Sequence, residues 1–110
     1  MEENVRQELA AMEQMVLNWK SNHLGFATPD GGNDFLIEDF EEEIITYVSP
    51  YLRRLYQCEH LTAEEAEEFM NHCNNQVEDL RRLIQEVETP PVKPGVWSIL
   101  IGKTKEVWRE

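Results

Sequence analysis

Hydrophobic residues recur every three or four positions in three separate stretches of this chain, and each stretch is typical of an amphipathic helix. The first stretch covers about residues 3–22. Its apolar positions are Val5, Leu9, Met12, Val16 and Trp19. Spacings of three and four place these side chains along one face of a helix. Residues 22–33 then contain glycine, proline, asparagine and aspartate in a run that predicts a loop.

The second helical stretch begins near Asp34, with Asp34 or its neighbour as the N-cap. Its apolar positions are Ile37, Phe40, Ile44, Val48, Tyr51 and Leu55. Pro50 lies inside this stripe, where a proline removes one hydrogen bond and presses against the carbonyl of Thr46. The sequence allows a kink between Thr46 and Pro50, or a break with Ser49 as the N-cap of a new helix. The unbroken phase of the stripe favours the kink.

The third helical stretch begins at Thr62, after a link formed by residues 57–61. Thr62-Ala63-Glu64-Glu65 matches the capping box, in which the hydroxyl and the later carboxylate each accept a hydrogen bond from the other residue's backbone amide. The helix is expected to continue for about 27 residues, until Thr89-Pro90-Pro91 stops it. Its apolar positions are Ala66, Phe69, Cys73, Val77, Leu80, Ile84 and Val87.

The short link predicts that the second and third helices form an antiparallel hairpin. If the turn is centred near residue 60, residues at the same level have numbers that add up to about 120. This register places arginines of one helix beside acids of the other at both ends of the hairpin. The expected neighbours are Arg53 with Glu67, Arg54 with Ala66 and the nearby Glu64 and Glu68, Arg81 with Asp39, and Arg82 with Glu38.

These patterns together predict an all-α fold, namely a three-helix bundle built on an antiparallel helical hairpin. The first helix is expected to cover the remaining apolar face of the hairpin. The alternative is that this face stays open and is covered by a second copy in a larger, dimeric bundle.

The character of the chain changes at Thr89. Residues 1–88 contain 20 acidic and 6 basic side chains, a formal charge of −14, whereas residues 89–110 contain 2 and 4, a charge of +2. We therefore divide the chain into an acidic helical bundle, residues 1–88, and a proline-linked aromatic docking tail, residues 89–110. The tail is expected to form a β-hairpin that turns at Gly102-Lys103 or, as the less favoured alternative, a short helix. Either form places Trp97 and Trp108 on one face.

Composition limits the class of protein further. A chain of 110 residues with 41% apolar and 29% charged residues is typical of one small folded domain. No apolar run reaches the length of a membrane span, and the first residues lack the features of a secretory signal. With only two cysteines, these features favour a cytoplasmic location. A net charge of −12 argues against direct binding to nucleic acid or to a membrane, because such binding relies on Lys and Arg.

One set of side chains invites comparison with a zinc site, because Cys58, His60, His72 and Cys73 supply two sulfurs and two imidazoles. The predicted hairpin puts the first two at its turn and Cys73 about 15 Å along it. Adjacent residues of a helix, such as His72 and Cys73, also point about 100° apart. We therefore expect no metal site, and we expect Cys73 to be a buried apolar side chain.

The density of glutamates suggests carboxylate metal sites of two kinds. A ferritin-type site needs a glutamate three residues before a histidine, but Phe69 holds that position before His72. A metal-dependent phosphate enzyme would instead bind Mg²⁺ with acids from facing helices. The acids it would use are Glu38, Glu41, Glu42, Glu64, Glu65, Glu67 and Glu68. In the predicted hairpin these two groups lie at opposite ends.

Catalytic motifs are not found in the chain. Gly102-Lys103-Thr104 resembles the end of a phosphate-binding loop, but the glycine required at position 97 is Trp97. None of the three histidines, His23, His60 and His72, lies in a signature for nucleophilic catalysis. The sequence therefore favours a protein that is not an enzyme and that holds no cofactor.

The expected function is that of a small helical protein acting through protein–protein contacts, as an adaptor, assembly factor or regulator. The partner is expected to be another protein or a second copy of the chain. The residues expected to make the contact are Trp97, Ile99, Ile101 and Trp108, because tryptophan is enriched at interface hot spots. Two alternatives stay open: a metal-dependent, all-helical phosphate or nucleotide enzyme, and an acidic decoy that blocks a nucleic-acid-binding protein.

Overall fold

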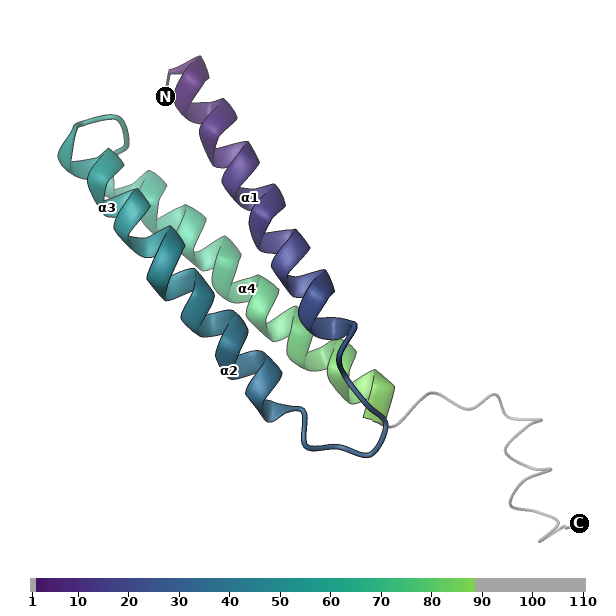
Figure 1. The fold of residues 1–110 in the computed structure, drawn as a ribbon. Coiled ribbons are helices and arrows are strands. Elements are labelled where there is room, and N and C mark those ends of the chain that lie inside the picture. The colour runs from purple at the N-terminus through teal and green to yellow at the C-terminus, as the bar shows by residue number, and fades with distance from the viewer. Residues whose placement is uncertain (1, 89–110) are drawn as a thin grey trace, which may run out of the picture.

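The protein forms an all-α bundle in which three helical rods lie side by side (Figure 1). The computed structural model describes residues 2–88, so the predicted docking tail lies outside the described residues. The first rod is α1 (Glu3–Leu24), and the third is α4 (Ala63–Glu88). The second rod consists of α2 (Asp34–Glu43), the π-helical turn η1 (Ile44–Val48) and α3 (Ser49–Gln57). The predicted three-helix bundle is confirmed.

The second rod passes through Pro50 without a break. Ser49 has helical backbone angles, φ −60° and ψ −48°, so the predicted alternative in which Ser49 caps a new helix is wrong. The backbone N–H of Ser49 donates to the carbonyl of Ile44, five residues earlier, which is the hydrogen bond of a π turn. A wider turn directly before a proline is a recognised way for a helix to accommodate the ring and the missing N–H.

The loop between α1 and α2 is held together by one buried side chain. Asn33 is only 2% exposed, and its side chain accepts a hydrogen bond from the Thr28 backbone N–H and donates to the Thr28 carbonyl. The same amide nitrogen donates to Glu88 at the end of α4, at 2.7 Å. Asn33 is the N-cap residue of α2, but its side chain makes no capping bond. It fastens the loop to α4 instead.

The turn between α3 and α4 ends one helix and begins the next with local hydrogen bonds. The N–H groups of His60 and Glu59 donate to the carbonyls of Leu55 and Tyr56, with Glu59 in the left-handed region at φ 64°. The predicted capping box then begins α4: Thr62 N–H donates to Glu65, and Glu65 N–H donates to the Thr62 hydroxyl. The turn is therefore short and internally bonded, and the two helices that it joins lie antiparallel and in contact.

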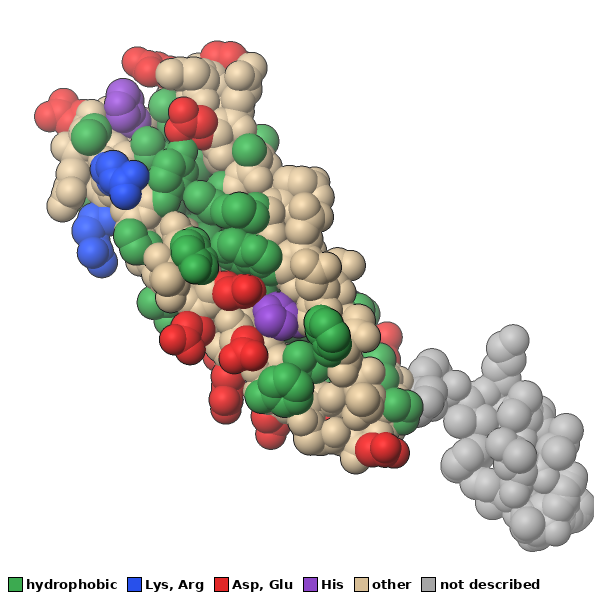
Figure 2. Space-filling model, viewed as in Figure 1, with side chains coloured by type: hydrophobic (Ala, Val, Ile, Leu, Met, Phe, Trp, Pro, Cys, Tyr) green, Lys and Arg blue, Asp and Glu red, His purple; other side chains and the backbone are tan. Residues whose placement is uncertain are grey.

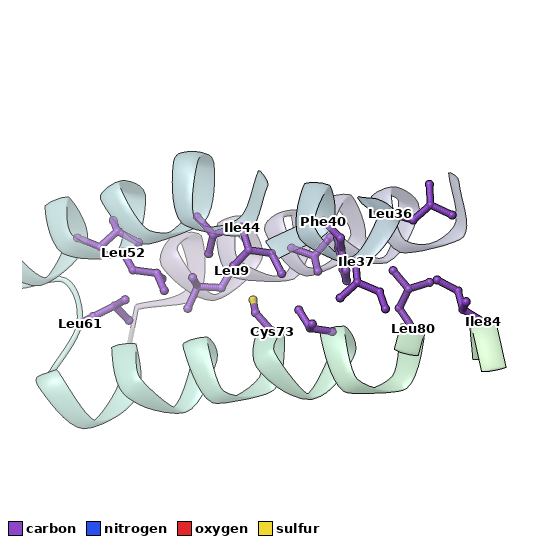
Figure 3. Packing of buried hydrophobic residues seen from close by; sticks show 14 of the residues in the cluster. Leu9, Leu36, Ile37, Phe40, Ile44, Leu52, Leu61, Cys73, Leu80 and Ile84 are labelled. Carbon is purple, nitrogen blue, oxygen red and sulfur yellow. The ribbon is translucent and has the colours of Figure 1, made fainter. Parts of the chain in front are cut away.

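Apolar side chains from all three rods form one continuous core. Figure 3 shows Ile37 and Ile44 of the second rod facing Cys73 and Leu80 of α4. Most of the predicted stripe residues are buried, and six are only partly so: Met12, Trp19, Tyr51, Ala66, Phe69 and Val87. The fully formed core consists of Val5, Leu9, Val16, Leu36, Ile37, Phe40, Ile44, Val48, Leu52, Leu55, Leu61, Cys73, Val77, Leu80 and Ile84.

Candidate protein-interaction surface

Charge is distributed unevenly along the second rod, and this marks out α3. The helix α2 carries six acidic residues, whereas residues 44–58 contain none and α3 carries Arg53 and Arg54. Figure 2 shows the same separation on one face of the molecule, with acidic side chains gathered over α2 and basic ones over α3. The first turns of α4, beside α3, again carry four glutamates within residues 64–68. A basic helix therefore lies against an acidic one.

Between α3 and the start of α4 runs a groove of about 370 Å³, which we call the α3–α4 groove. No residue that lines it belongs to α1, so the groove opens on the side of the hairpin that α1 leaves uncovered. Its floor is mostly apolar, and Arg53 and Glu67 stand on its two walls. The lining residues are Ser49, Leu52, Arg53, Tyr56, Ala63, Ala66, Glu67 and Met70.

Large hydrophobic side chains are exposed along the α3 edge of this groove. Tyr56 is 50% exposed and lines the groove directly. Ile45 is 64% exposed and lies one turn before Ser49, another lining residue. A wide apolar groove with exposed aromatic and aliphatic neighbours is typical of a surface that another protein covers.

The other side of the hairpin is covered by α1, partly through a polar network. The Lys20 ammonium group of α1 donates to Asp79 at 2.6 Å and to Gln76 at 2.7 Å, both on α4. Arg82 donates to the other carboxylate oxygen of Asp79 at 2.5 Å. The hydrogen bond from Lys20, and then that from Arg82, lower the pKa of Asp79 below its usual value. Asp79 is therefore ionised at neutral pH and links the two helices.

All three histidines of the chain lie beside glutamates across the boundary of α1. His23 Nε2 lies 2.9 Å from a carboxylate oxygen of Glu43, and His60 Nδ1 lies 3.9 Å from Glu2. His72 Nε2 lies 2.7 Å from Glu13, but the two groups are not aligned for a hydrogen bond. Each contact is ionic only when the imidazole is protonated. The histidines thus help to position α1 and do not surround a reaction centre.

Two tyrosines of the second rod also contact α1, one through its ring and one through its hydroxyl group. The Trp19 ring lies 5.9 Å from the Tyr47 ring, centroid to centroid. The Tyr51 hydroxyl of α3 donates to Glu8 of α1. Burial and this hydrogen bond raise the pKa of Tyr51 to about 12, so the phenol stays protonated and remains a donor. Tyr47 and Tyr51 therefore face α1, whereas Tyr56 faces the groove.

Among the described residues no arginine forms an ion pair across the hairpin, although Arg53 and Glu67 line the same groove, as the predicted register places them. Arg81 pairs with Glu78, and Arg82 pairs with Asp79 and Glu86, all within α4. Within residues 2–88, neither Arg53 nor Arg54 forms an ion pair with an acid of α4. A side chain three or four residues away on the same helix is already close, whereas a partner on another helix must be brought within reach by packing.

The cysteine and histidine set considered for zinc is dispersed in the structure. Cys58 is exposed at the end of α3, and Cys73 is buried in the core. Burial, and to a lesser extent the charge of Glu13, raise the pKa of the Cys73 thiol to about 11. Cys73 is therefore a neutral core residue at pH 7, as predicted. Among residues 2–88, no group of three or more Cys, His, Asp and Glu side chains is placed to hold a metal ion.

The glutamates considered for a phosphate enzyme fall into two separate places. Glu64, Glu65, Glu67 and Glu68 line a hollow at the start of α4. Glu42 lines another with Asp39 and His23, between α1 and α2. The groups do not converge on a common point, which leaves no geometry for a shared metal ion in the described part of the chain.

A larger hollow, of about 610 Å³, lies at the turn between α3 and α4. Several of its polar groups already have partners, since Glu65 and Thr62 form the capping box and His60 lies beside Glu2. Among the described residues, its acids and His60 do not form a group that could hold a metal ion. The hollow is lined by Glu2, Tyr56, Gln57, Glu59, His60, Leu61, Thr62 and Glu65.

The four residues predicted to make the protein contact, Trp97, Ile99, Ile101 and Trp108, lie outside the described residues, and their role stays a prediction. Sequence reasoning missed the α3–α4 groove. The signal that could have found it is the acid-free run at residues 44–58, followed closely by the small residues Ala63 and Ala66. The predicted apolar stripes of the second and third helices did not indicate the groove, because Leu52, Tyr56 and Met70 lie beside these stripes and not on them.

No protein-family model matches the chain, and neither a curated protein nor a solved structure shows significant similarity to it. Among residues 2–88, no helix is both long and apolar enough to cross a membrane.

Proposed function

We propose that this protein is a non-enzymatic helical module that works by binding other protein surfaces, and that the α3–α4 groove is a contact surface of the bundle. The observation that carries the proposal is the groove itself. It has an apolar floor, two oppositely charged walls, and a half-exposed tyrosine, Tyr56, on the side that α1 does not cover. Interfaces of this kind are anchored by aromatic and long side chains within a charged rim.

The predicted tail complements this proposal. Residues 89–110 carry a charge of +2 and two tryptophans, and they continue from the end of α4, the helix that forms one wall of the groove. We keep Trp97, Ile99, Ile101 and Trp108 as the second proposed contact, to a protein partner. The proposed adaptor, assembly or regulatory role, in the cytoplasm, rests on these two surfaces.

The enzyme alternative gains no support among residues 2–88, since the acids it would use lie in separate hollows. The acidic-decoy alternative rests on charge alone, and acidic surfaces of this density also serve solubility. The contact function is therefore the one that the described residues favour.

Site-specific photo-cross-linking tests the proposal. A photoreactive phenylalanine analogue replaces Tyr56 in the groove or, as the matched control, Phe35, which is 54% exposed on α2 and lies outside the groove lining. Irradiation in cells that make the protein is expected to yield discrete protein adducts from position 56 and far fewer from position 35. Equal adduct yields at both positions would refute the groove as a contact surface.

A further inference from the structure

We propose that a second copy of this chain covers the α3–α4 groove, with the two copies related by a two-fold axis that runs along the groove. This inference rests on the proposed function, because it names the partner of the same surface. The levels of the side chains along the two helices, their sizes and their charges all favour this arrangement.

The residues that line the groove fall into three levels. In an antiparallel hairpin, residues equally far from the turn lie at the same level. With the turn between Gln57 and Thr62, Tyr56 lies level with Ala63, and Arg53 with Ala66 and Glu67. Ser49 lies level with Met70. All of these side chains line the one groove, as this register requires.

A two-fold axis along the groove exchanges the two walls and keeps each level unchanged. It therefore places α3 of each copy over α4 of the other, antiparallel, as in a four-helix bundle. At one end, Tyr56 meets Ala63 of the second copy. At the other end, Ser49 meets Met70 of the second copy. A large side chain opposes a small one at both ends, which is how facing helices interlock.

The charges favour the same axis. At the middle level, Arg53 of each copy meets Glu67 of the other, so two ion pairs form across the interface. Neither side chain has an ion-pair partner among residues 2–88, so both are available. A two-fold axis across the groove would instead place α3 over α3 and bring the arginines together. Like charges facing each other oppose that arrangement.

The rest of the surface restricts association to this site. Residues 2–88 carry a formal charge of −14, so most other pairs of faces would place acid against acid. Among the described helices, only α3 carries basic residues and no acidic ones. The contact is also short, since α3 has nine residues. Its area should fall below the ~800 Å² per partner of a standard interface, which predicts a dimer with an affinity in the micromolar range.

Charge reversal with purified full-length chains tests the inference by sedimentation velocity. The wild type is expected to change from monomer, 13.0 kDa, to dimer as its concentration rises to about 500 µM. Arg53→Glu and Glu67→Arg are each expected to weaken the dimer at least about tenfold, because both ion pairs become repulsive. Both substitutions lie on the exposed edge of the groove, and helix content by circular dichroism should stay unchanged.

Mixing the two variants provides the decisive measurement. In a mixed dimer, one copy carries acid at both positions and the other carries base at both, so both contacts across the axis are attractive again and dimers should reappear. Glu41→Arg and Arg81→Glu are the controls. They make the same charge changes outside the groove lining, and each is expected to dimerise within about threefold of the wild type. A wild type that stays monomeric throughout, or a mixture no stronger than its components, would overturn the inference.

The cross-linker at position 56 separates failure of this inference from failure of the proposed function. Adducts to residues 63–70 of a second copy support the dimer. Adducts to residues 89–110, or only to other proteins, overturn the dimer. Adducts to other proteins still support a contact function for the groove, whereas equal yields at positions 56 and 35 refute that function independently of the sedimentation result.

Discussion

The helical hairpin has one side that α1 covers and one side that it leaves open, and the two sides are built differently. On the covered side, core residues such as Phe40 and Val48 are fully buried, and polar links join one helix to another, as between Lys20 and Asp79. On the open side, Ile45 and Tyr56 are at least half exposed, and Arg53 and Glu67 stand on opposite walls of a groove. The covered side holds the bundle together, whereas the open side is the one that we propose as a contact surface.

The largest expected effect is a difference in stability between alanine substitutions at two phenylalanines of α2. Phe40 is completely buried and Phe35 is 54% exposed. Phe40→Ala should lower the free energy of unfolding by about 3–5 kcal/mol, because it removes buried apolar surface and leaves a cavity. Phe35→Ala should change it by less than about 1 kcal/mol. Urea denaturation of both variants measures the difference, and similar losses would contradict the burial of Phe40 in the core and the exposure of Phe35.

A smaller effect is expected at the end of the bundle, where Asn33 joins the loop to α4. Asn33→Ala removes three hydrogen bonds and leaves the Thr28 backbone groups without these partners. Each hydrogen bond contributes about 0.5–1.5 kcal/mol net, and the free energy of unfolding should fall by about 1–3 kcal/mol. Asn75→Ala, at an exposed position on α4, is the control and should be nearly neutral. A neutral result at Asn33 would mean that the loop is not fastened by this side chain.

The smallest expected effect concerns the link between Lys20 and Asp79, and it depends on pH. The pKa of Asp79 is lower in the folded protein than its usual value. Its contribution to stability is therefore complete above the usual aspartate pKa, ~4, and is lost as the pH falls through the lower folded value. Lys20→Met should destabilise the protein slightly at pH 7, since the pair is partly exposed.

Thermal unfolding at several pH values checks this last prediction. The difference between the wild type and Lys20→Met should shrink as the pH falls below about 4. Arg81→Met, which removes an exposed pair within α4, is the control and should be close to neutral at neutral pH. A difference that stays constant down to the lowest pH would show that the lysine acts through packing and not through the charge of Asp79.

The sequence predicted the helices well because their signals are local. The spacing of Val5, Leu9 and Val16 is a property of one segment, and so is the Thr62–Glu65 capping box, which the structure reproduces bond for bond. Pro50 is also a local signal, but it was compatible with either a kink or a break in the helix. The π turn at Ile44–Val48 depends on whether the rod must stay straight enough to keep both halves against α4, which is a property of the packed bundle.

The partners of charged side chains could not be predicted in the same way. Arg81 and Arg82 have acids three or four residues away on their own helix. They form ion pairs with these acids and not with the predicted neighbours on α2. Asp79, by contrast, receives a hydrogen bond from Lys20, far away in the sequence. Such a contact depends on how α1 is rotated and shifted along the hairpin.

The sequence by itself determined three amphipathic helices, the capping box that begins α4, the antiparallel hairpin and the burial of Cys73, because periodicity and capping act within a few residues. Only the tertiary structure decided which side of the hairpin α1 covers. That choice leaves Tyr56, Arg53 and Glu67 around an open groove, and it follows from the packing of whole helix faces, which no local pattern encodes.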